Sequence, residues 1–580
     1  MRPLLLLCLL AACSDKAGDN PDDSGIPSSD DSSSSSDDSS ATDDSADPLL
    51  CGNGALDQGE DCDDGESNGA STCGCQTDCS LPGPATSCDD GSLCTDQDAC
   101  DSQGSCAGTP ITCDDSDACT TDTCDEGTGQ CVNAGFSGTA RDLYDMDMLR
   151  DPTTLDLEVL STSTTLEGLT LVEVSEVRYT SYESEGCELR PVRIEAYIAK
   201  PVNASGRIPG LVVAHGLGGN ATAGAATNPA GELGVVALAY SGPGQGQSEG
   251  TGSTSDHLFD TATNPQNSWF WEHSVAAIRG LTVLENLPDV DPTRLGMTGF
   301  SGGGVATYMV NGVDDRLDVA VPVSATGYLD SAARATPNHG WEYDLLQAMS
   351  PPRTPDSIEW QNYVDYLDPK NFLPTSHADT LMIVGSQDEF FPIDSAVDTL
   401  NGIASSGRSV RLLSIKDWDH GWYALFNSEQ PAIDAANSLN YFIKSRLGLD
   451  SSLAELAPQP QVDGLISWIC FYGNFPYNCS AVQASLPTST GYRVTEAKLH
   501  FSADGALTFA TWNLQQSGSV WQAEVGTLDG TVYNSSNLVY FVEFTFQQGY
   551  FGPEFKLTSV PNIPAGFQPN IIPIDGPLQN

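Results

Sequence analysis

Arg294-Leu-Gly-Met-Thr-Gly-Phe-Ser301-Gly-Gly303, near the middle of the chain, contains the pattern Gly-x-Ser-x-Gly. The residues before Gly299 predict a strand, and residues 305–310 predict a helix. A strand-to-helix turn with such glycines holds its serine in a strained conformation that exposes the hydroxyl. A glycine-rich turn with an incidental serine is the alternative. Because the strand and the helix stand in the expected order, we interpret Ser301 as a nucleophile.

A serine nucleophile needs a base, and the base needs an acid that orients it. On a strand-turn-helix frame of this kind the chain order is serine, acid, histidine. Asp388 follows the apolar run 381–384, and His420 follows the predicted strand 410–415. Open α/β sheets place their sites at such strand ends. We therefore expect Asp388 to be the acid and His420 to be the base.

Each of these assignments has alternatives. Glu389 and Asp394 compete with Asp388 for the role of the acid, and His420 has the alternative of being an ordinary histidine of a surface loop. Other histidines lie in the wrong places to be the base: His215, His257, His273, His339 and His377.

The negative charge that develops during acyl transfer also needs hydrogen-bond donors. The apolar run 211–214 leads into the glycine-rich loop His215-Gly-Leu217-Gly-Gly219. A loop in this position supplies one backbone N–H, and the residue after the nucleophile supplies the other. We expect Leu217 and Gly302 to be these donors. His215 is interpreted as a structural residue that holds the loop by hydrogen bonds.

Between residues 140 and 450 predicted strands alternate with predicted helices. Apolar residues alternate with polar ones over 192–198, whereas 211–214, 235–239 and 381–384 are continuous apolar runs. Helices are predicted at 268–287 and at 431–447, where Pro431 begins the second one and Gly448 ends it. This alternation predicts the α/β class, with a mostly parallel sheet and helices on both faces.

Residues 190–450 resemble the α/β-hydrolase superfamily, and within it acetyl xylan esterases, dienelactone hydrolases and relatives of prolyl oligopeptidase. The residues that carry the resemblance are 215–219, Tyr240-Ser-Gly-Pro-Gly-Gln-Gly-Gln-Ser248, 291–304, Asp314-Asp-Arg316, 385–392 and Asp419-His-Gly421. The resemblance implies acyl transfer to water through an acyl-enzyme on Ser301, without a metal or another cofactor. It does not choose between esters and amides. Relatives often carry a charged residue where this chain has Tyr240-Ser241-Gly242.

Residues 327–377 form an insertion between two of the predicted strands, with aromatic residues scattered through it: Trp341, Tyr343, Trp360, Tyr363 and Tyr366. Insertions at this position often cover the active site, and here a cap would shape an apolar pocket for the substrate. A helical excursion packed away from the site is the alternative.

The N-terminus predicts export. Arg2 precedes a short leucine-rich run, and Leu10-Ala-Ala-Cys13 resembles the bacterial lipobox, in which the cysteine is acylated after cleavage. We expect residues 1–12 to be a lipoprotein signal peptide and Cys13 to carry a lipid that holds the protein on a bacterial membrane, at the cell surface or in the periplasm. An ordinary signal peptide or a short membrane anchor is the alternative. The run is too short to span a bilayer, and no later segment has enough apolar residues.

The next part of the chain is strongly acidic. The whole chain has a formal charge of −56. Residues 14–135 hold 29 acidic residues and one basic residue, Lys16, so they carry a net −28. Such a field repels phosphate backbones and argues against nucleic-acid binding. Residues 13–48 are mostly Asp, Ser and Thr, and this composition predicts a disordered tether.

Residues 49–135 contain 13 of the 18 cysteines, which an exported chain is expected to oxidise to disulfides. Cys88-Asp-Asp-Gly-Ser-Leu-Cys94-Thr recurs as Cys113-Asp-Asp-Ser-Asp-Ala-Cys119-Thr, and each repeat has four cysteines, enough for two bridges. The preceding unit, Cys51 to Cys79, resembles the disulfide-rich repeats of myxobacterial surface proteins but has a fifth cysteine, for which Cys187 is a candidate partner. These modules are candidates for binding surface partners.

Two groups of aspartates lie within the repeats: Asp96, Asp98 and Asp101; and Asp114, Asp115 and Asp117. Their spacing does not match an EF-hand loop, so we favour a solvated acidic face over a calcium site. Residues 451–580 form short β-rich runs at 497–501, 507–512 and 539–546, which predict a small antiparallel β domain, a sandwich, with Cys470 paired to Cys479.

Taken together, these features predict an exported serine hydrolase that cleaves a small or polymer-linked ester. Two alternatives remain. One is a serine peptidase of the prolyl oligopeptidase type, and the other is a surface adhesion or scaffold protein with an inert hydrolase domain. The complete set of Ser301, Asp388 and His420 weighs against the inert domain.

Overall fold

A computed structural model describes residues 51–114, 120–336, 338–420, 429–453, 455–472, 475–487, 491–524, 538–550 and 552–567, together with 569 and 571. The predicted signal peptide, the lipidation site Cys13 and the acidic tether lie outside these residues. The described chain forms two compact units, one that ends at Phe136 and one that begins at Ser137. Among the described helices, none combines the length and the hydropathy that a bilayer-spanning helix requires.

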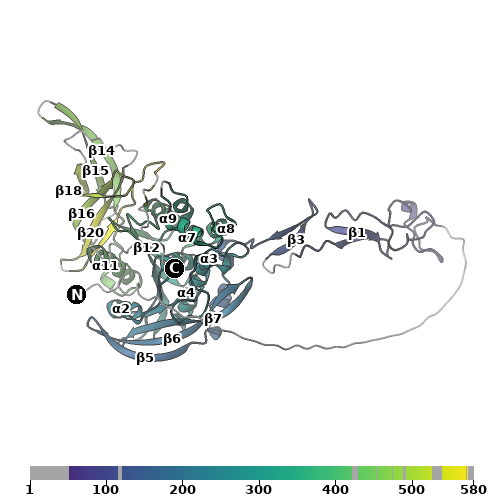
Figure 1. The fold of residues 1–580 in the computed structure, drawn as a ribbon, viewed down its shortest axis with the longest axis horizontal. Coiled ribbons are helices and arrows are strands. Elements are labelled where there is room, and N and C mark those ends of the chain that lie inside the picture. The colour runs from purple at the N-terminus through teal and green to yellow at the C-terminus, as the bar shows by residue number, and fades with distance from the viewer. Residues whose placement is uncertain are drawn as a thin grey trace. The chain divides into compact units, whose positions relative to one another are not determined.

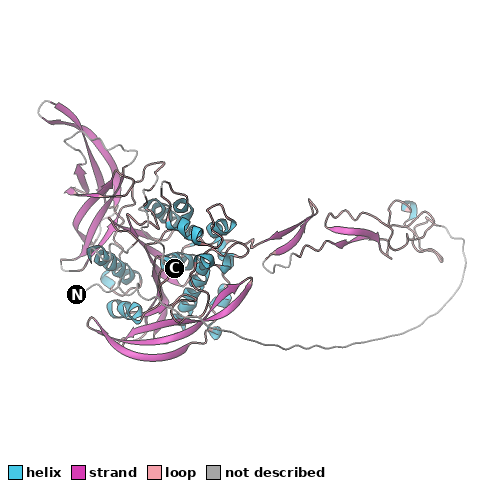
Figure 2. Cartoon of the chain, in the orientation of Figure 1, coloured by secondary structure: helices cyan, strands magenta, loops and turns pink. Residues whose placement is uncertain are grey.

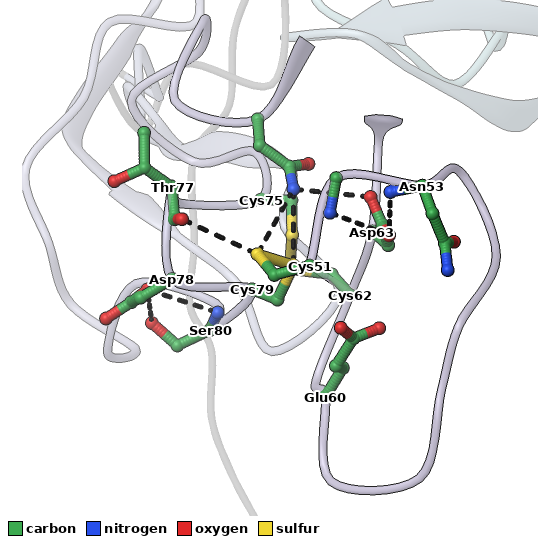
Figure 3. Close-up of a disulfide and its surroundings, with 12 residues drawn as sticks. Cys51, Asn53, Glu60, Cys62, Asp63, Cys75, Thr77, Asp78, Cys79 and Ser80 are labelled. Atoms are coloured by element: carbon green, nitrogen blue, oxygen red, sulfur yellow. Dashed lines mark hydrogen bonds between the residues drawn. A yellow bond between two sulfur atoms is a disulfide. The ribbon is translucent and has the colours of Figure 1, made fainter. Parts of the chain in front are cut away.

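The N-terminal unit consists of short loops and two hairpins that are joined by disulfides. Its strands are β1 (Thr95–Cys100), β2 (Cys106–Pro110), β3 (Thr121–Asp125) and β4 (Gln130–Ala134). Before them, the bridges Cys51–Cys79 and Cys62–Cys75 lie side by side (Figure 3). The carboxylate of Asp63 caps the adjacent loop by accepting the N–H of Asn53 at 2.9 Å. Disulfides and local caps therefore replace an apolar core in this unit.

The pairing of the repeats differs from the expected two internal bridges each. One bridge is internal to each repeat, Cys88–Cys106 in the first and Cys113–Cys131 in the second. The other bridges link neighbours in the series: Cys73–Cys100 and Cys94–Cys124. The cysteines alone could not show this chaining, because spacing does not define connectivity.

The partner proposed for Cys187 was wrong. Both candidates for the fifth cysteine are bonded elsewhere, Cys73 to Cys100 and Cys75 to Cys62. Cys187 is itself disulfide-bonded, so its partner is neither of them.

The second unit is built on a nine-stranded sheet (Figure 1). Its strand order is β13-β12-β11-β10-β8-β9-β7-β6-β5, and the neighbours from β13 to β9 are parallel. The strands are β5 (Glu158–Glu167), β6 (Thr170–Glu185), β7 (Glu188–Pro201), β8 (Ile208–Ala214), β9 (Val236–Tyr240), β10 (Val290–Phe300), β11 (Leu317–Val323), β12 (Asp379–Gly385) and β13 (Val410–Ile415). The predicted parallel strands are thus present, and the α/β-hydrolase fold is confirmed.

An antiparallel edge adds to this sheet. The strands β7, β6 and β5 pair antiparallel in succession (Figure 1). The strand β7 also pairs antiparallel with β9. Sequence analysis found only part of β7. It missed β5 because that edge strand is exposed along nearly its whole length and rich in Ser and Thr, so no buried face produces an apolar alternation.

Helices cover both faces of the sheet. Residues of α2 (Ala223–Leu233) and α11 (Glu429–Arg446) share one apolar core with Leu211 and Val321. On the other face lie α4 (Trp269–Asn286) and α5 (Gly302–Val313). A side chain at Gly280 of α4 would meet Leu238 at 3.2 Å, so this glycine lets the helix lie close to the sheet.

The other described α-helices of the unit lie between these elements in the chain. They are α1 (Met146–Leu149), α3 (Ser255–Leu258), α6 (Leu329–Ala333), α7 (Trp341–Ala348), α8 (Ile358–Tyr366) and α9 (Ile393–Ser405). The predicted insertion 327–377 contains α6, α7 and α8 between β11 and β12.

The segment after α11 is built almost wholly of strands (Figure 2). Two antiparallel four-stranded sheets have the orders β14-β15-β19-β18 and β17-β16-β20-β21. Their strands are β14 (Gln461–Tyr472), β15 (Phe475–Ser485), β16 (Tyr492–Ser502), β17 (Ala510–Asn513), β18 (Gln515–Ser517), β19 (Val520–Glu524), β20 (Val539–Gln548) and β21 (Glu554–Thr558). Trp521 of one sheet packs edge-on against Phe544 of the other, at 4.8 Å between ring centroids.

These sheets belong to the same compact unit as the hydrolase sheet. Tyr441 of α11 stacks on Phe555 of β21 with the ring centroids 3.5 Å apart, and residues of both parts share one apolar core. The side chains of Cys470 and Cys479 lie outside the description, so their pairing stays a prediction.

Candidate active site

The turn that carries Ser301 joins β10 directly to α5. Ser301 has φ 56° and ψ −120°, a conformation that side chains other than glycine rarely adopt. A Cβ at Gly299 would lie 2.3 Å from the carbonyl oxygen of Gly303, and a Cβ at Gly303 would lie 2.4 Å from that of Ala214. The two outer glycines of the motif are therefore required by the close approach of strand and helix. Strain of this kind is a common feature of functional sites.

The structure brings the three residues expected to form the triad together. The Ser301 Oγ lies 2.7 Å from Nε2 of His420, and the Nδ1 of that imidazole lies 3.0 Å from Oδ1 of Asp388. All three residues are buried: Ser301 is 6% exposed, His420 2% and Asp388 4%. This arrangement allows the imidazole to accept a proton from the serine while the carboxylate fixes its orientation.

The alternative acids occupy other positions. Glu389 accepts a hydrogen bond from the backbone N–H of His420 at 3.0 Å rather than from its ring. Burial raises the pKa of Glu389 to about 7, and the neighbouring Asp388 adds to this rise. Asp394 lies in the first turn of α9, and no hydrogen bond joins it to His420 among the described residues. The geometry favours Asp388 as the orienting acid.

The backbone also holds the acid. The N–H groups of Phe390 and Phe391 both donate to Oδ1 of Asp388 at 3.0 Å. The Phe390 ring lies 4.0 Å from the imidazole of His420, measured between ring centroids. Sequence analysis did not identify this aromatic contact, although Phe390 directly follows the two acids.

The predicted oxyanion donors lie beside Ser301. The backbone nitrogen of Leu217 would be 3.2 Å from a Cβ placed on Gly302, and Cβ of Ser301 would be 3.1 Å from one on Gly216. Within the described chain, neither Leu217 nor Gly302 uses its backbone N–H in another hydrogen bond. Two N–H groups are thus available near the place where charge would develop.

His215 holds the loop that contains Leu217. Its Nε2 accepts the N–H of Gly242 at 2.7 Å, and its Nδ1 lies 2.6 Å from the carbonyl oxygen of Gly216. Burial lowers the pKa of His215 to about 4, so the ring is neutral at pH 7 with the proton on Nδ1. These contacts fit the structural role expected for it.

Glu195 holds the loop 240–248, which departs from the pattern of relatives, by hydrogen bonds. The carboxylate of Glu195 accepts from the Ser241 hydroxyl and from the backbone N–H of Gln247, both at 2.9 Å. Ser241 in turn accepts the N–H of Ala221 at 2.9 Å. Sequence analysis missed Glu195, since its place in an alternating strand gave no sign that the polar face is buried.

A small cavity of about 10 Å³ adjoins Gly302. The helix α5, the loop that follows Asp388 and the insertion 327–377 all contribute to its wall, which is formed by Phe259, Phe270, Gly302, Val305, Leu329, Trp341, Glu342, Tyr363 and Phe391. Trp341 of the insertion also packs edge-on against Phe390, with 5.0 Å between the centroids. The insertion thus lies against the site rather than away from it.

One cluster of buried side chains contains the donor types of a metal site. Glu183, His257 and Glu272 offer ligand atoms within 4.8 Å of one another. However, His257 bonds Glu272 at 2.9 Å and Glu183 bonds Arg190 at 2.6 Å, so the charges are already paired. Burial raises the pKa of Glu272 to about 7, and the bond to His257 opposes that rise. We therefore interpret the cluster as a network of ion pairs.

In the N-terminal unit, ligand atoms of Asp89, Asp90 and Asp98 also lie within 4.8 Å of one another. The carboxylate of Asp90 accepts the N–H groups of Ser92 and Gly108, and that of Asp98 accepts the N–H of Asp90. These carboxylates therefore cap turns of the backbone. Of these three, only Asp98 is among the aspartates that the sequence analysis considered. The solvated acidic face stays a prediction.

Comparison with known proteins gives the following likenesses. Residues 144–429 match the acetyl xylan esterase (AXE1) family. An acetyl xylan esterase from Paenibacillus sp. R4 is 19% identical over 51% of this chain and 94% of its own, with a TM-score of 0.41. Acetyl xylan esterase 1 from Thermoanaerobacterium sp. JW/SL YS485 is 21% identical over 51% of this chain and 99% of its own, with a TM-score of 0.36.

A putative dienelactone hydrolase from Klebsiella pneumoniae subsp. pneumoniae MGH 78578 is 16% identical over 47% of this chain and 98% of its own, with a TM-score of 0.30. No curated protein is significantly similar to the chain. The sheet order, the strand-to-helix turn at Ser301 and the family match agree, and residues 144–429 form a hydrolase domain of the α/β-hydrolase superfamily that matches the acetyl xylan esterase family.

Proposed function

We propose that this protein is an exported serine esterase that cleaves a carboxylic ester through an acyl-enzyme on Ser301. The observation that carries the proposal is the continuous chain of hydrogen bonds from Ser301 Oγ through His420 to Asp388. The match of residues 144–429 to the acetyl xylan esterase family favours an ester over a peptide. The substrate is then a small or polymer-linked ester.

In the first half of the reaction, Nε2 of His420 accepts the Ser301 proton while the serine oxygen attacks the ester carbonyl. The N–H groups of Leu217 and Gly302 donate to the oxyanion that forms. Collapse of this intermediate breaks the bond to the alcohol, which leaves with the proton from His420. Asp388 stabilises the imidazolium while it exists.

In the second half, His420 removes a proton from water, and the resulting attack forms a second oxyanion in the same place. Collapse then releases the carboxylic acid and returns the proton to Ser301 Oγ. Every step uses side chains or backbone groups of this chain.

The test compares p-nitrophenyl acetate with peptide p-nitroanilides, together with labelling by a fluorophosphonate probe. We expect ester hydrolysis and labelling in the wild type and neither in Ser301→Ala. Faster cleavage of the anilides would favour a peptidase. If neither substrate reacts and the probe does not label, the protein is a surface scaffold with an inert hydrolase domain.

We also propose that a lipid on Cys13 attaches the protein to a bacterial membrane. The support is the Leu10-Ala-Ala-Cys13 pattern after a leucine-rich run. Wild-type protein expressed with its N-terminus should partition into detergent, and Cys13→Ser should release it into the aqueous phase. A wild-type protein that stays in the aqueous phase would contradict the anchor.

A further inference from the structure

The hydrogen bonds of the His420 side chain are made at the edge of its ring. Ser301 Oγ lies 2.7 Å from Nε2, and Oδ1 of Asp388 lies 3.0 Å from Nδ1. Because the proton and the lone pair of these nitrogens point outward in the ring plane, such partners do not cover a face of the imidazole. The two faces are therefore left to other groups of the site.

Among the described residues, three phenylalanine rings lie around this imidazole. The distance between ring centroids is 4.0 Å for Phe390, 5.4 Å for Phe300 and 5.5 Å for Phe391. Phe300 directly precedes Ser301, and the other two follow Asp388 by two and three residues. The segments that carry the triad thus also supply aromatic rings around its base.

The ring of Phe390 lies over a face of the imidazole. Aromatic pairs usually have their centroids about 4.5–7 Å apart, and an edge-on contact cannot bring two rings closer than this. At 4.0 Å, with 37° between the ring planes, the phenyl ring of Phe390 must overlap the imidazole face to face with a tilt. The face of a phenyl ring carries partial negative charge. Phe390 therefore presents negative charge to the ring that becomes an imidazolium.

Two contacts hold Phe390 in this place. Its backbone N–H donates to Oδ1 of Asp388 at 3.0 Å, and Trp341 of α7 packs edge-on against its ring with 5.0 Å between the centroids. His420 is only 2% exposed, so water has little access to its ring, and a positive charge there is costly unless neighbouring groups stabilise it. A ring that is already held over the imidazole needs no reorganisation when the charge forms.

We propose that Phe390 is a positioning residue of the reaction, and that the face of its ring stabilises the imidazolium that His420 becomes when it takes up a proton from Ser301 or from water. This inference rests on the proposed esterase function. A cation within about 6 Å of an aromatic face gains an amount that corresponds to about 2- to 30-fold in rate. The neutral imidazole of the resting enzyme gains less, so the contact acts on the transition state and not on substrate binding.

The experiment replaces Phe390 in the full chain with 4-fluoro-, 3,5-difluoro- and 3,4,5-trifluorophenylalanine. Each added fluorine withdraws electron density from the face of the ring and changes its shape little. Because the attraction of a cation to the ring is electrostatic, kcat on p-nitrophenyl acetate should fall stepwise along the series, by about fivefold at its end. KM should stay within about twofold of the wild type. Phe390→Leu, which has no aromatic face, should lower kcat by about tenfold.

The matched control places the same fluorinated residues at Phe442. This ring of α11 is buried in the apolar core, and its fluorination should leave kcat at the wild-type value throughout. Thermal unfolding checks that each variant at both positions is folded. The fluorinated series at Phe390 keeps the test decisive if Phe390→Leu does not fold.

The outcomes separate this inference from the proposed function. If the wild type does not hydrolyse the ester, the esterase function itself fails. If the wild type is active and kcat does not change along the fluorinated series at Phe390, the ring acts by its bulk alone, and the inference is overturned while the function stands. A rise of KM in place of a fall of kcat also overturns it, because the ring would then act on substrate binding. An equal fall of kcat in the Phe442 series overturns it as well, since the effect would not come from the face of Phe390.

Discussion

The carboxylate of Glu389 accepts a 3.0 Å hydrogen bond from the backbone N–H of His420. Asp388, the preceding residue, lies 3.0 Å from Nδ1 on the ring of the same histidine. Two consecutive acids therefore hold one histidine at two points: Asp388 fixes its tautomer, and Glu389 fixes its main chain. These unequal roles predict unequal effects of substitution.

Asp388→Asn should lower kcat on a reactive ester by about 10³–10⁴, because an amide at this place favours the wrong imidazole tautomer. Glu389→Gln should cost about tenfold or less, since its amide oxygen can still accept the His420 N–H. Steady-state kinetics on p-nitrophenyl acetate measures both losses. A larger loss for Glu389→Gln would show that the assignment of the acid is off by one residue.

Stability should depend on pH through Glu389. Its pKa rises from 4.5 to about 7 on folding, chiefly through burial. The folded state then binds more protons than the unfolded state between these values, so stability from this group is full below pH 4.5 and falls as pH rises to 7. The free energy of unfolding that is lost over this pH range is about 3 kcal/mol at most.

Glu389→Gln removes this titration, so its free energy of unfolding relative to wild type should increase between pH 5 and pH 8. Urea denaturation at both values measures the change. Glu188→Gln, at an exposed position of β7, is the control and should show no such trend. An equal difference at the two pH values would contradict the buried titration.

The folded protein should be more stable with glycine at position 301 than with a residue that has a Cβ. The φ of 56° at this position is costly for a residue with a Cβ, and relief of that cost outweighs the greater entropy of an unfolded glycine. The free energy of unfolding of Ser301→Gly, measured by denaturant titration, should therefore exceed that of Ser301→Ala by about 1 kcal/mol. Both variants should be inactive. If the alanine variant is the more stable one, the turn is not strained as described.

Sequence patterns locate the three candidate residues of the triad because these stand at the ends of apolar strands, where the chain order restricts the roles that they could have. Ser301, Asp388 and His420 are brought together from three such ends. Glu342 could not be identified in this way. Its burial depends on how the insertion packs against α5 and on the acid loop, and nothing local in Gly340-Trp-Glu342 indicates a buried carboxyl.

The strand β5 and the disulfide chain were not predictable for similar reasons. An exposed edge strand needs no apolar face, and cysteine spacing allows many connectivities. Leu507-Thr-Phe-Ala-Thr-Trp512 illustrates a boundary error: β17 begins only at Ala510, because Phe509 turns into a small core with Ile393 and Phe541.

The N-terminal unit should be dispensable for catalysis. The unit with the site begins at Ser137, and Thr139 and Asp142 cap its first turn. A protein that starts at Ser137 should keep kcat and KM on a small ester within about twofold of the longer protein. Any loss of the Cys187 disulfide is expected to affect stability rather than rate, as a thermal unfolding scan would show. A tenfold fall in kcat with the fold intact would mean that the repeats contribute to the site.

The C-terminal sheets should not be dispensable, because they support the loops of the acid and the base. The backbone N–H of Phe509 donates to the Asp417 carboxylate at 3.2 Å, and Gln387 donates to the carbonyl oxygen of Leu507. The hydroxyl of Thr558 accepts the N–H of Ser414 at 2.9 Å and so covers the outer edge of β13.

A chain that ends at Asp450 would expose that strand edge and the aromatic face of α11, and we expect it to aggregate or to lose cooperative unfolding. Phe509→Ala tests the same support without truncation. Removal of this ring from the core that it forms with Ile393 should lower the free energy of unfolding by about 3 kcal/mol. Its kcat should fall together with stability as temperature rises, because this core holds the start of α9, directly after the acid loop. A soluble, fully active protein ending at Asp450 would show instead that the hydrolase sheet holds the triad without help.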